Sequence, residues 1–313
     1  MTRHLLIVNP ASGRGTAEQR VPLLKEAFDA LGLSFDLVRT EGPMHAAELS
    51  QKGAADGYDV VVAVGGDGTA NEVINGLMRA QEAAAGPIPA MGVLCVGRGN
   101  DFAFGAGIPI DLQEGCRALA AGRRTRIDIG RVAGGLFPDG RFFGNGVGVG
   151  FDAVVGFEAL KMKRLHGFAS YVVAALKTIF LYFRAPLVRL EIDGQSQTQR
   201  ALMVSIMNGR RMGGGFMMAP SGRNDDGLFD LCIAREVSRP GILALIPRFM
   251  QGTQATHPAI TTARARTVRV TALEGALPAH ADGETLCVEG KELSLEILAA
   301  RLEVIGAGDE GRA

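Results

Sequence analysis

The stretch VVVAVGGDGTANEVINGL, Val60 to Leu77, decides the fold of the first half of this chain. Its opening run is apolar and mostly β-branched, which predicts a strand buried on both faces of a parallel sheet. Gly65, Gly66 and Gly68 follow, and glycine lets a backbone turn sharply and approach a ligand closely. From Thr69 onward apolar residues recur at helical spacing. The stretch therefore predicts a strand, a glycine loop and the start of a helix.

An acidic residue, Asp67, stands inside this loop. The unpaired amides and the positive dipole end of a helix favour an anion such as phosphate, which a lone aspartate would repel. The carboxylate is explained if the phosphate arrives with a divalent cation, or if a hydroxyl group must be oriented nearby. A purely structural alternative is that Asp67 caps the helix. Thr69 and Glu72 also match a capping box, in which each side chain satisfies a backbone amide of this helix.

Length, charge and cysteine usage limit the class of protein. A chain of 313 residues suggests about two domains. Lys plus Arg and Asp plus Glu are both 33, so the balanced charge disfavours a nucleic-acid partner. The N-terminus runs directly into a predicted strand without a signal peptide, which predicts a cytoplasmic protein. The cysteines lack a CxxC pair and argue against zinc or a disulfide framework; they are Cys95, Cys116, Cys232 and Cys287.

Strand and helix patterns alternate along residues 1–127. This order predicts an open parallel α/β sheet with helices on both faces, whose ligands lie at the carboxyl ends of the strands. The predicted strands are 5–9, 34–40, 60–64 and 91–96, and the predicted helices begin near Thr16, His45 and Thr69.

Three glycine-rich loops follow strands of this predicted sheet. They are NPASGRG (Asn9 to Gly15), GGDGT (Gly65 to Thr69) and VGRGND (Val96 to Asp101). None is a P-loop, and none is a dinucleotide-binding GxGxxG between a strand and a helix. Because the carboxyl ends of parallel strands meet at one sheet edge, the three loops together predict a nucleotide-phosphate site.

Residues 128–313 change to short strand patterns separated by turns, which predicts a mostly antiparallel β-sandwich. In GNGVGVG, glycines from Gly144 to Gly150 recur at every second position, so one face of that strand lacks side chains. Close packing of backbone and a groove that faces a ligand both explain such a strand.

One apolar helix is predicted within the second region, at Gly167 to Phe183. It is too short and too interrupted to span a membrane, and its apolar stripe suits a core helix. Basic residues precede it, so a second interpretation is a helix that contacts lipid at a membrane surface. These basic residues are Lys161, Lys163 and Arg164.

Taken together, the motifs resemble a known family. NPASGRG, GGDGTANEVINGL, GRGNDFA, NGVGVGFDA, DDGLFDL and ADGE occur in the order found in bacterial diacylglycerol kinase-like lipid kinases, which are related to sphingosine kinases and NAD kinases. The similarity covers nearly the whole chain. It implies an α/β nucleotide-binding domain at 1–127, a β-rich lipid-substrate domain at 128–313 whose last strand returns to the first domain, and an active site between them.

The resemblance also implies roles for individual residues. ATP with Mg²⁺ is expected as phosphoryl donor, a membrane lipid such as diacylglycerol as acceptor, and Asp282 as acceptor of the lipid hydroxyl proton. Asp67 is expected to hold the metal or order its water, with Glu284 and Asp101 in support. A structural Mg²⁺ is expected at Asp226 and at the carbonyls of Arg223 and Leu228. The expected nucleotide-binding residues are Asn9, Ser12, Gly13, Thr40, Gly66, Asp67, Gly68, Thr69, Asn71, Glu72, Arg98, Asn100 and Asp101.

The third loop departs from the family pattern PLGTxNDFA. Cys95 replaces the proline and Arg98 replaces the threonine, so the usual nucleotide contact at that position is in question. A guanidinium at Arg98 is suited to contact phosphate instead.

Three alternatives remain open from the sequence. They are a kinase for a soluble nucleotide such as NAD, a kinase for a sphingoid base or ceramide, and a binding protein without catalysis. The presence of Asp67, Asp101, Asp226, Asp282 and Glu284 disfavours the last. The expected setting is phospholipid metabolism, with the protein at the inner membrane face and a homodimer as one arrangement.

Overall fold

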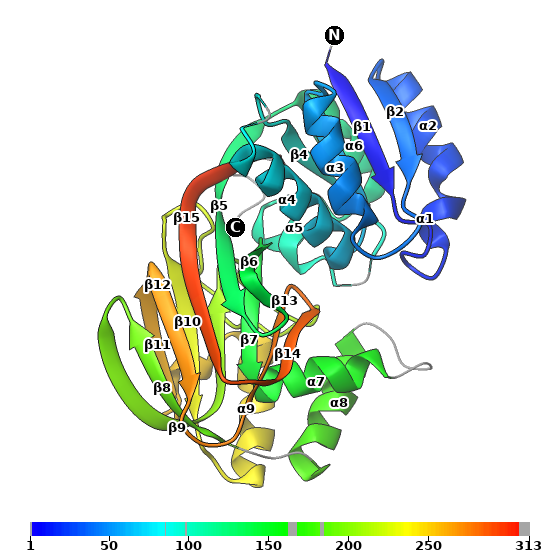
Figure 1. The fold of residues 1–313 in the computed structure, drawn as a ribbon. Coiled ribbons are helices and arrows are strands. Elements are labelled where there is room, and N and C mark those ends of the chain that lie inside the picture. The colour runs from blue at the N-terminus through cyan, green and yellow to red at the C-terminus, as the bar shows by residue number, and fades with distance from the viewer. Residues whose placement is uncertain (1, 85, 98, 162–167, 182–184, 307–313) are drawn as a thin grey trace. The chain divides into compact units, whose positions relative to one another are not determined.

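The computed structural model describes residues 2–84, 86–97, 99–161, 168–181 and 185–306. The chain divides into two compact units (Figure 1). Unit 1 contains residues 1–127 and 300–313, and unit 2 contains residues 128–299. Two long strands, β5 (Arg124–Gly134) and β15 (Glu292–Ile305), contribute residues to both units.

Unit 1 is built on a parallel sheet with the strand order β4, β3, β1, β2, and the end of β15 adds to β4 through the parallel pair Val304 and Met91. Strand β3 is buried along its whole length, as its unbroken apolar run predicts. The fold class expected for the first half is confirmed. The strands are β1 (Arg3–Val8), β2 (Ser34–Arg39), β3 (Val60–Gly65) and β4 (Ala90–Cys95).

Helices cover both faces of this sheet (Figure 1). Alternate strand residues point to opposite faces, so Leu6 and Val62 pack in one core with residues of α2 and α6. Leu5 and Val61 point the other way, toward Gly53 of α3. The helices are α1 (Thr16–Gln19), α2 (Val21–Ala30), α3 (His45–Ala55), α4 (Asp67–Glu82), α5 (Asp101–Gly105) and α6 (Leu112–Ala121).

The capping box predicted for the helix after the glycine loop is wrong. Helix α4 begins at Asp67 and has no side-chain cap at its N-terminus. The Thr69 hydroxyl instead accepts a hydrogen bond from Asn9 at 3.1 Å, and the Glu72 carboxylate accepts one from the Ala46 amide of α3 at 3.1 Å. Both side chains therefore connect α4 to other elements of unit 1.

Unit 2 is a β-sandwich, as predicted. One sheet has the order β9, β8, β12, β15, β5, β6, and the other has the order β11, β10, β9, β7, β13, β14. A single core contains buried residues from both sheets, among them Leu190 and Val270 from the first and Val204 and Leu231 from the second. The remaining strands are β6 (Phe137–Phe143), β7 (Gly146–Gly150), β8 (Leu187–Ile192), β9 (Gln195–Met207), β10 (Phe229–Arg235), β11 (Ile260–Ala265), β12 (Thr267–Ala272), β13 (Leu277–Ala281) and β14 (Glu284–Gly290).

Strand β9 belongs to both sheets of the sandwich. Its residues Gln195–Arg200 pair with β8, and its residues Ala201–Met207 pair with β7 and β10. The first part is largely exposed and the second part is buried. A strand that changes sheets in this way forms a corner of a sandwich.

Helices also occur in unit 2 beyond the predicted one. The segment α7 (Phe151–Leu160) directly follows β7, and α9 (Arg239–Gln251) follows β10, with the short 3-10 helix η1 (Gln254–Thr256) after it. The predicted helix is present as α8 (Phe168–Leu181), where Ile179 is buried and Leu176 is 38% exposed, so its apolar side chains do not all face the core. Among the described residues, no helix combines the length and apolar character needed to cross a membrane.

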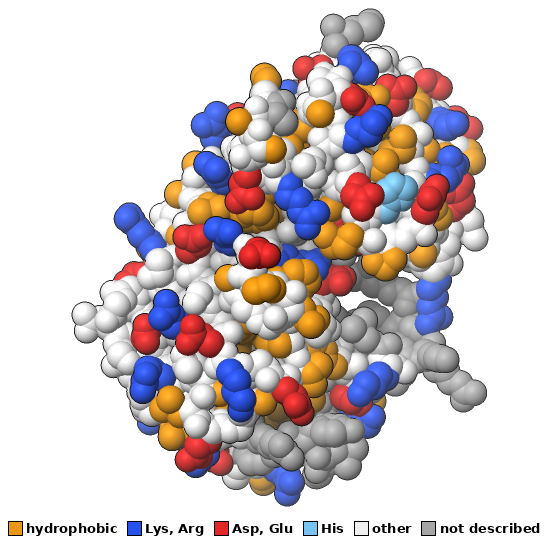
Figure 2. All heavy atoms as spheres, in the orientation of Figure 1, with side chains coloured by type: hydrophobic (Ala, Val, Ile, Leu, Met, Phe, Trp, Pro, Cys, Tyr) orange, Lys and Arg blue, Asp and Glu red, His pale blue; other side chains and the backbone are white. Residues whose placement is uncertain are grey.

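The glycine-rich strand β7 is covered by protein. A Cβ at Gly146 would lie 2.7 Å from the Met207 sulfur, and one at Gly148 would lie 2.6 Å from side-chain atoms of Asp152 and His280. Close packing therefore explains the missing side chains at these two glycines. On the face that Figure 2 shows, Lys and Arg side chains are interspersed with Asp and Glu side chains, which matches the equal numbers of positive and negative residues in the sequence.

Candidate functional site

The three glycine loops of unit 1 contact one another at the carboxyl ends of the parallel strands. Asn9 follows β1, and its side-chain amide donates to the Thr69 hydroxyl in the first turn of α4. The Ser12 hydroxyl lies 3.4 Å from the same oxygen. These contacts bring the loops after β1 and β3 together, as the sequence predicts for strands of one parallel sheet.

Glycine allows the closest approaches between these loops. The Gly13 backbone has φ +60°, and a Cβ there would lie 2.7 Å from the Val96 carbonyl oxygen in the third loop. Gly66 and Gly97 also approach backbone to backbone, because a Cβ on Gly97 would lie 2.5 Å from the Gly66 Cα. A side chain at either position would push the loops apart.

Asp67 joins the second loop to the third. Its Oδ1 accepts a hydrogen bond from the Phe102 amide at 3.1 Å, in the first turn of α5. Its Oδ2 and the Asp101 Oδ2 lie 2.7 Å and 3.6 Å from the position of a Cβ on Gly99. Asp67 therefore caps α5 rather than its own helix α4. Two carboxylates also face the same small residue, an arrangement that favours a cation.

The other predicted nucleotide residues differ in what their side chains contact. The Glu72 carboxylate accepts a hydrogen bond from the Ala46 amide of α3. Asn71 is buried, and its side-chain oxygen accepts a hydrogen bond from Asn75. Thr40 follows β2 and its amide bonds to the Val8 carbonyl at 2.9 Å, which places it at the same sheet edge. Gly68 lies within the first turn of α4.

The third loop contains Asn100 in the left-handed conformation, with φ +51°. Its side-chain amide donates to the Gly97 carbonyl at 3.2 Å, which closes the loop immediately before α5. Arg98, the residue that departs from the family pattern, lies outside the described residues. Its contact with phosphate stays a prediction.

In unit 2, Asp282 occupies the turn of the β13–β14 hairpin. Asp282 and Gly283 have φ +48° and +87°, as a tight two-residue hairpin turn requires. The Asp282 carboxylate accepts hydrogen bonds from the amides of Gly144, Asn145 and Gly146, at 2.8, 3.0 and 2.8 Å. This aspartate is therefore a turn residue whose carboxylate is held in one orientation by β7 and the loop before it. Glu284 begins β14 and is exposed.

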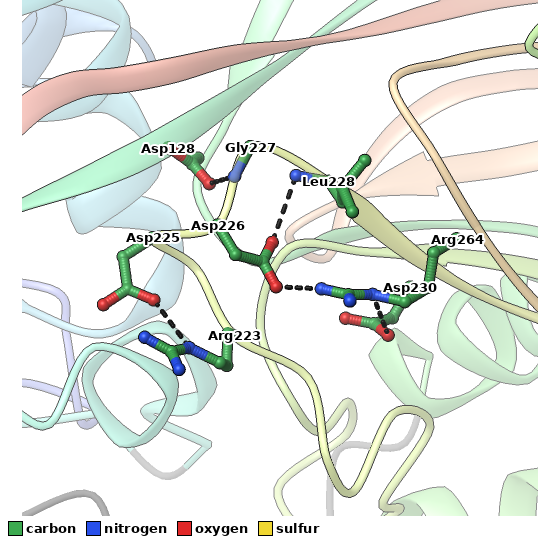
Figure 3. Close-up of polar contacts among 8 residues, drawn as sticks. All are labelled: Asp128, Arg223, Asp225, Asp226, Gly227, Leu228, Asp230 and Arg264. Carbon is green, nitrogen blue, oxygen red and sulfur yellow. Dashed lines mark hydrogen bonds and ion pairs between the residues drawn. The ribbon is translucent and has the colours of Figure 1, made fainter.

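The predicted metal turn, Arg223 to Asp230, also belongs to unit 2 (Figure 3). Asp226 accepts a hydrogen bond from the Leu228 amide at 3.1 Å, and its other oxygen forms an ion pair with Arg264. Arg264 also approaches Asp230, with Nε 3.5 Å from Oδ1. The guanidinium therefore balances two carboxylates of this turn.

The residues of this turn fit a divalent cation in their chemistry. Carboxylate and carbonyl oxygens are the ligands that Mg²⁺ prefers. The Asp230 Oδ2 is buried and has no hydrogen-bond partner in the part of the chain that the structure describes. Burial raises the pKa of Asp230 above its ordinary value, against a hydrogen bond from the Arg223 backbone. A cation at Asp226 and Asp230 would stabilise both carboxylates by adding positive charge, as the Arg264 guanidinium does.

We expect Arg264→Met to make the stability of unit 2 depend on Mg²⁺. Methionine keeps much of the side-chain volume but leaves the two carboxylates unbalanced, at a cost of about 1 to 2 kcal/mol for a half-exposed arginine. Thermal unfolding with and without Mg²⁺ measures this, and Mg²⁺ should raise the Tm of the variant more than that of the wild type.

Arg269→Met is the matched control for this substitution. Arg269 is equally exposed, and its Nε lies 3.9 Å from Glu292, so its loss should change stability by less than about 0.5 kcal/mol. If Arg264→Met behaved like this control, and Mg²⁺ affected both variants equally, the turn would hold no cation.

Several residues around these sites were not predicted from the sequence. Asp230 lies in the quoted DDGLFDL motif, where its spacing from Asp226 is a detectable signal. Buried Asp128 accepts a hydrogen bond from the Gly227 amide at 2.7 Å, and no local pattern connects these two distant positions (Figure 3). Asp152 stands within the quoted motif NGVGVGFDA and His280 directly precedes the quoted motif ADGE, but neither had a predicted role.

Comparison with known proteins gives the family. A family model described as diacylglycerol kinase catalytic domain matches residues 3–132. Another, described as YegS C-terminal NAD kinase beta sandwich-like domain, matches residues 145–306. The chain is 30% identical over 307 residues to a diacylglycerol kinase of Mycobacterium tuberculosis, covering 96% of this chain and 93% of that one. It is 25% identical over 283 residues to a diacylglycerol kinase of Staphylococcus carnosus, covering 90% and 88%.

Solved structures show the same fold. A diacylglycerol kinase from Bacillus anthracis superimposes with a TM-score of 0.71 at 22% identity, covering 98% of this chain and 97% of that one. A yeast NADH kinase in complex with NADH reaches a TM-score of 0.52 at 10% identity, covering 99% and 85%. The family models and the 30% identical relative confirm the resemblance noted in the motifs: the chain belongs to the diacylglycerol kinase family and is a kinase.

Proposed function

We propose that this kinase transfers the γ-phosphate of ATP to the hydroxyl group of a membrane lipid, with diacylglycerol as the first candidate. The names of the relatives support the lipid class. The convergence of three glycine loops beside the Asp67 and Asp101 carboxylates supports the phosphoryl donor. This convergence is the observation on which the proposal depends most.

The nucleotide half of the reaction belongs to unit 1. The N-terminus of α4 and the glycine loops present backbone amides and a positive dipole end to the phosphates. Mg²⁺ accompanies ATP as part of the substrate and neutralises charge on its phosphates. Asp67 and Asp101 would bind this ion or order its water ligands, which explains an acidic residue in a phosphate loop.

The acceptor half of the reaction uses Asp282. The lipid oxygen forms a bond to the γ-phosphorus, the bond from that phosphorus to the ADP oxygen breaks, and the hydroxyl proton passes to the Asp282 carboxylate. The three amides that bind this carboxylate orient it before the substrate arrives. Glu284, two residues further along the hairpin, would support the metal ion of the nucleotide.

A structural Mg²⁺ at the turn from Arg223 to Asp230 is a separate part of the proposal. Asp226, with Asp230 beside it, would hold the ion together with the carbonyls of Arg223 and Leu228. The ion would supply positive charge that stabilises the turn and would take no part in the transfer. Asp128 anchors the same turn through the Gly227 amide.

Contact with a membrane surface would use α8 and α9. These helices pack together, since Ile179 shares a buried cluster with Ile242 and Leu245. Apolar side chains remain exposed on both, and helices of this kind insert shallowly at a lipid interface. Lys161 and Lys177 pair with buried Glu158 and hold the pKa of that carboxyl below its ordinary value. Lys163 and Arg164 lie outside the described residues. The exposed apolar side chains are Val173, Leu176, Leu243 and Met250.

The experiment that tests this function offers the protein several acceptors at once. The wild-type protein is incubated with γ-labelled ATP and Mg²⁺ on vesicles of a total lipid extract, and the labelled lipid is identified by mass. Diacylglycerol is the expected product class, with activity that rises with anionic lipid in the vesicles and falls with salt. A parallel reaction with NAD tests the nucleotide alternative. Phosphorylation of NAD without labelled lipid would overturn the proposal, and a labelled sphingoid base or ceramide would change the substrate.

A further inference from the structure

A buried polar cluster connects α7 to the hairpin that contains Asp282. His280 of β13 pairs with Gly148 of β7, and Gly148 pairs with Ser205 of β9, so the three residues form one row across adjacent strands. Residues paired in this way point to the same face of the sheet. The His280 and Ser205 side chains are buried, at 9% and 0% exposure of their residues.

Gly148 provides the space in the middle of this row. A Cβ there would lie 2.6 Å from the Asp152 Oδ2 and 2.6 Å from the His280 Nε2. Asp152 stands in the first turn of α7, and its Oδ2 accepts a hydrogen bond from the Ser205 hydroxyl at 2.9 Å. The carboxylate oxygen and the imidazole nitrogen thus border the same space beside a residue that lacks a side chain.

The second ring nitrogen of His280 contacts the Asp282 turn. Its Nδ1 lies 3.3 Å from the Gly283 amide, which donates a hydrogen bond to it. An Nδ1 that accepts cannot carry a proton, so the neutral ring carries its proton on Nε2, the nitrogen that lies beside Gly148. Burial lowers the pKa of His280 to about 4. Burial also raises the pKa of Asp152 to about 7, although the hydrogen bond from Ser205 acts to lower it. The imidazole is therefore neutral at physiological pH.

The Asp282 turn is consequently held from two directions. The carboxylate of Asp282 binds the amides of residues 144–146, and the amide of Gly283 binds His280. Both residues of the turn have positive φ, a conformation that a non-glycine residue such as Asp282 adopts at some cost. The hydrogen bond that the Gly283 amide donates to His280 stabilises this turn conformation.

We propose that His280 is a positioning residue that sets the orientation of the Asp282 carboxylate. Asp152, which borders Gly148 as His280 does, helps to hold the His280 ring in place. The inference rests on the proposed function, in which Asp282 accepts the proton of the lipid hydroxyl. His280 acts through the Gly283 amide and does not contact substrate. Gly148 is required because a Cβ there would lie only 2.6 Å from both the Asp152 Oδ2 and the His280 Nε2.

Two substitutions of His280 separate positioning from packing. Asn places its side-chain oxygen where Nδ1 lies and keeps an acceptor for the Gly283 amide, whereas Gln extends toward the place of Nε2 and leaves that amide without one. We expect His280→Asn to keep kcat within about threefold of the wild type. His280→Gln should lose roughly 10- to 100-fold in kcat at unchanged KM for ATP, because small misplacements of a reacting group are costly.

Hydrogen exchange of the Gly283 amide provides a readout that does not depend on activity. Exchange should be slow in the wild type and in His280→Asn and faster in His280→Gln, with both variants equally folded by thermal unfolding. Equal kcat and equal Gly283 exchange in the two variants would overturn the positioning role, as would a kcat that follows Tm alone. A wild-type protein that labels no lipid would overturn the proposed function and this inference together, so the wild-type assay distinguishes the two failures.

Asp152→Asn and Asp152→Leu test the other side of His280. Asn keeps a side-chain oxygen beside Gly148, whereas Leu branches at the same carbon and has no acceptor. Asp152→Asn should retain turnover close to that of the wild type, and Asp152→Leu should lose turnover as His280→Gln does. If Asp152→Leu retained full turnover, Asp152 would have no part in positioning His280.

Discussion

Replacement of Asp282 by Asn should lower kcat by about 10² to 10⁴, the usual cost of losing a general base, with little change in ATP affinity. Asparagine has nearly the same shape but cannot accept the hydroxyl proton in the transition state. The measurement is steady-state lipid phosphorylation at saturating ATP and lipid, with ATP affinity determined separately. A variant that bound ATP weakly but kept its saturated turnover would make Asp282 a metal or nucleotide residue instead.

This substitution also has a structural cost, which requires a control. Asparagine offers one acceptor oxygen where the carboxylate offers two to the amides of Gly144, Asn145 and Gly146. Asp193 provides the match, because it too has positive φ in a hairpin turn, and its carboxylate binds the amides of Arg266 and Thr267. Asp193→Asn should lose similar stability but keep kcat. An equal loss of kcat in both variants would mean that Asp282 acts only through the fold.

Replacement of Asp67 by Asn should reduce turnover by about 100-fold or more and raise the Mg²⁺ concentration needed for half-maximal rate. The amide oxygen can still accept the hydrogen bond from Phe102, so α5 should keep its N-terminus. What is lost is one of the two charges that face Gly99. A titration of Mg²⁺ at fixed ATP measures the effect.

Asp111→Asn is the matched control for Asp67. Asp111 is the N-cap of α6, where its carboxylate accepts hydrogen bonds from the amides of Gln113 and Glu114. Asparagine is an equally good N-cap, so this variant should match the wild type in both stability and rate. If Asp67→Asn also matched the wild type, Asp67 would be a helix cap without a role in phosphoryl transfer.

The fold class follows from patterns that short segments contain. The buried run of β3, the alternation of strands and helices before Ile127 and the Asp-Gly turn after β13 depend on neighbouring residues, so the sequence displays them directly. Helix α9 escaped prediction although Ser238 caps its start and Gly252 ends it. Pro247 inside the helix interrupts the expected pattern, because proline usually ends a helix.

The candidate site is only partly visible in the sequence. The glycine loops and their meeting point were predictable, because the carboxyl ends of parallel strands share one edge. The group that each acidic side chain contacts was not predictable from the sequence. Glu72 matched a local capping box but binds α3, and the ion pair of Asp226 with Arg264 was not predicted, while its role as a metal ligand stays a prediction.

The sequence by itself determined the two architectures, the family and the positions of the glycine loops, since these depend on periodicity, turn chemistry and motif order. Only the tertiary structure decided which distant groups meet. The row of His280, Gly148 and Ser205 depends on the register of three strands, and a shift of one residue would turn each side chain to the other face. Asp67 reaches α5 only because β3 and β4 are neighbours in the sheet. Contacts of this kind arise when long loops close and strands align, and no window of sequence contains that information.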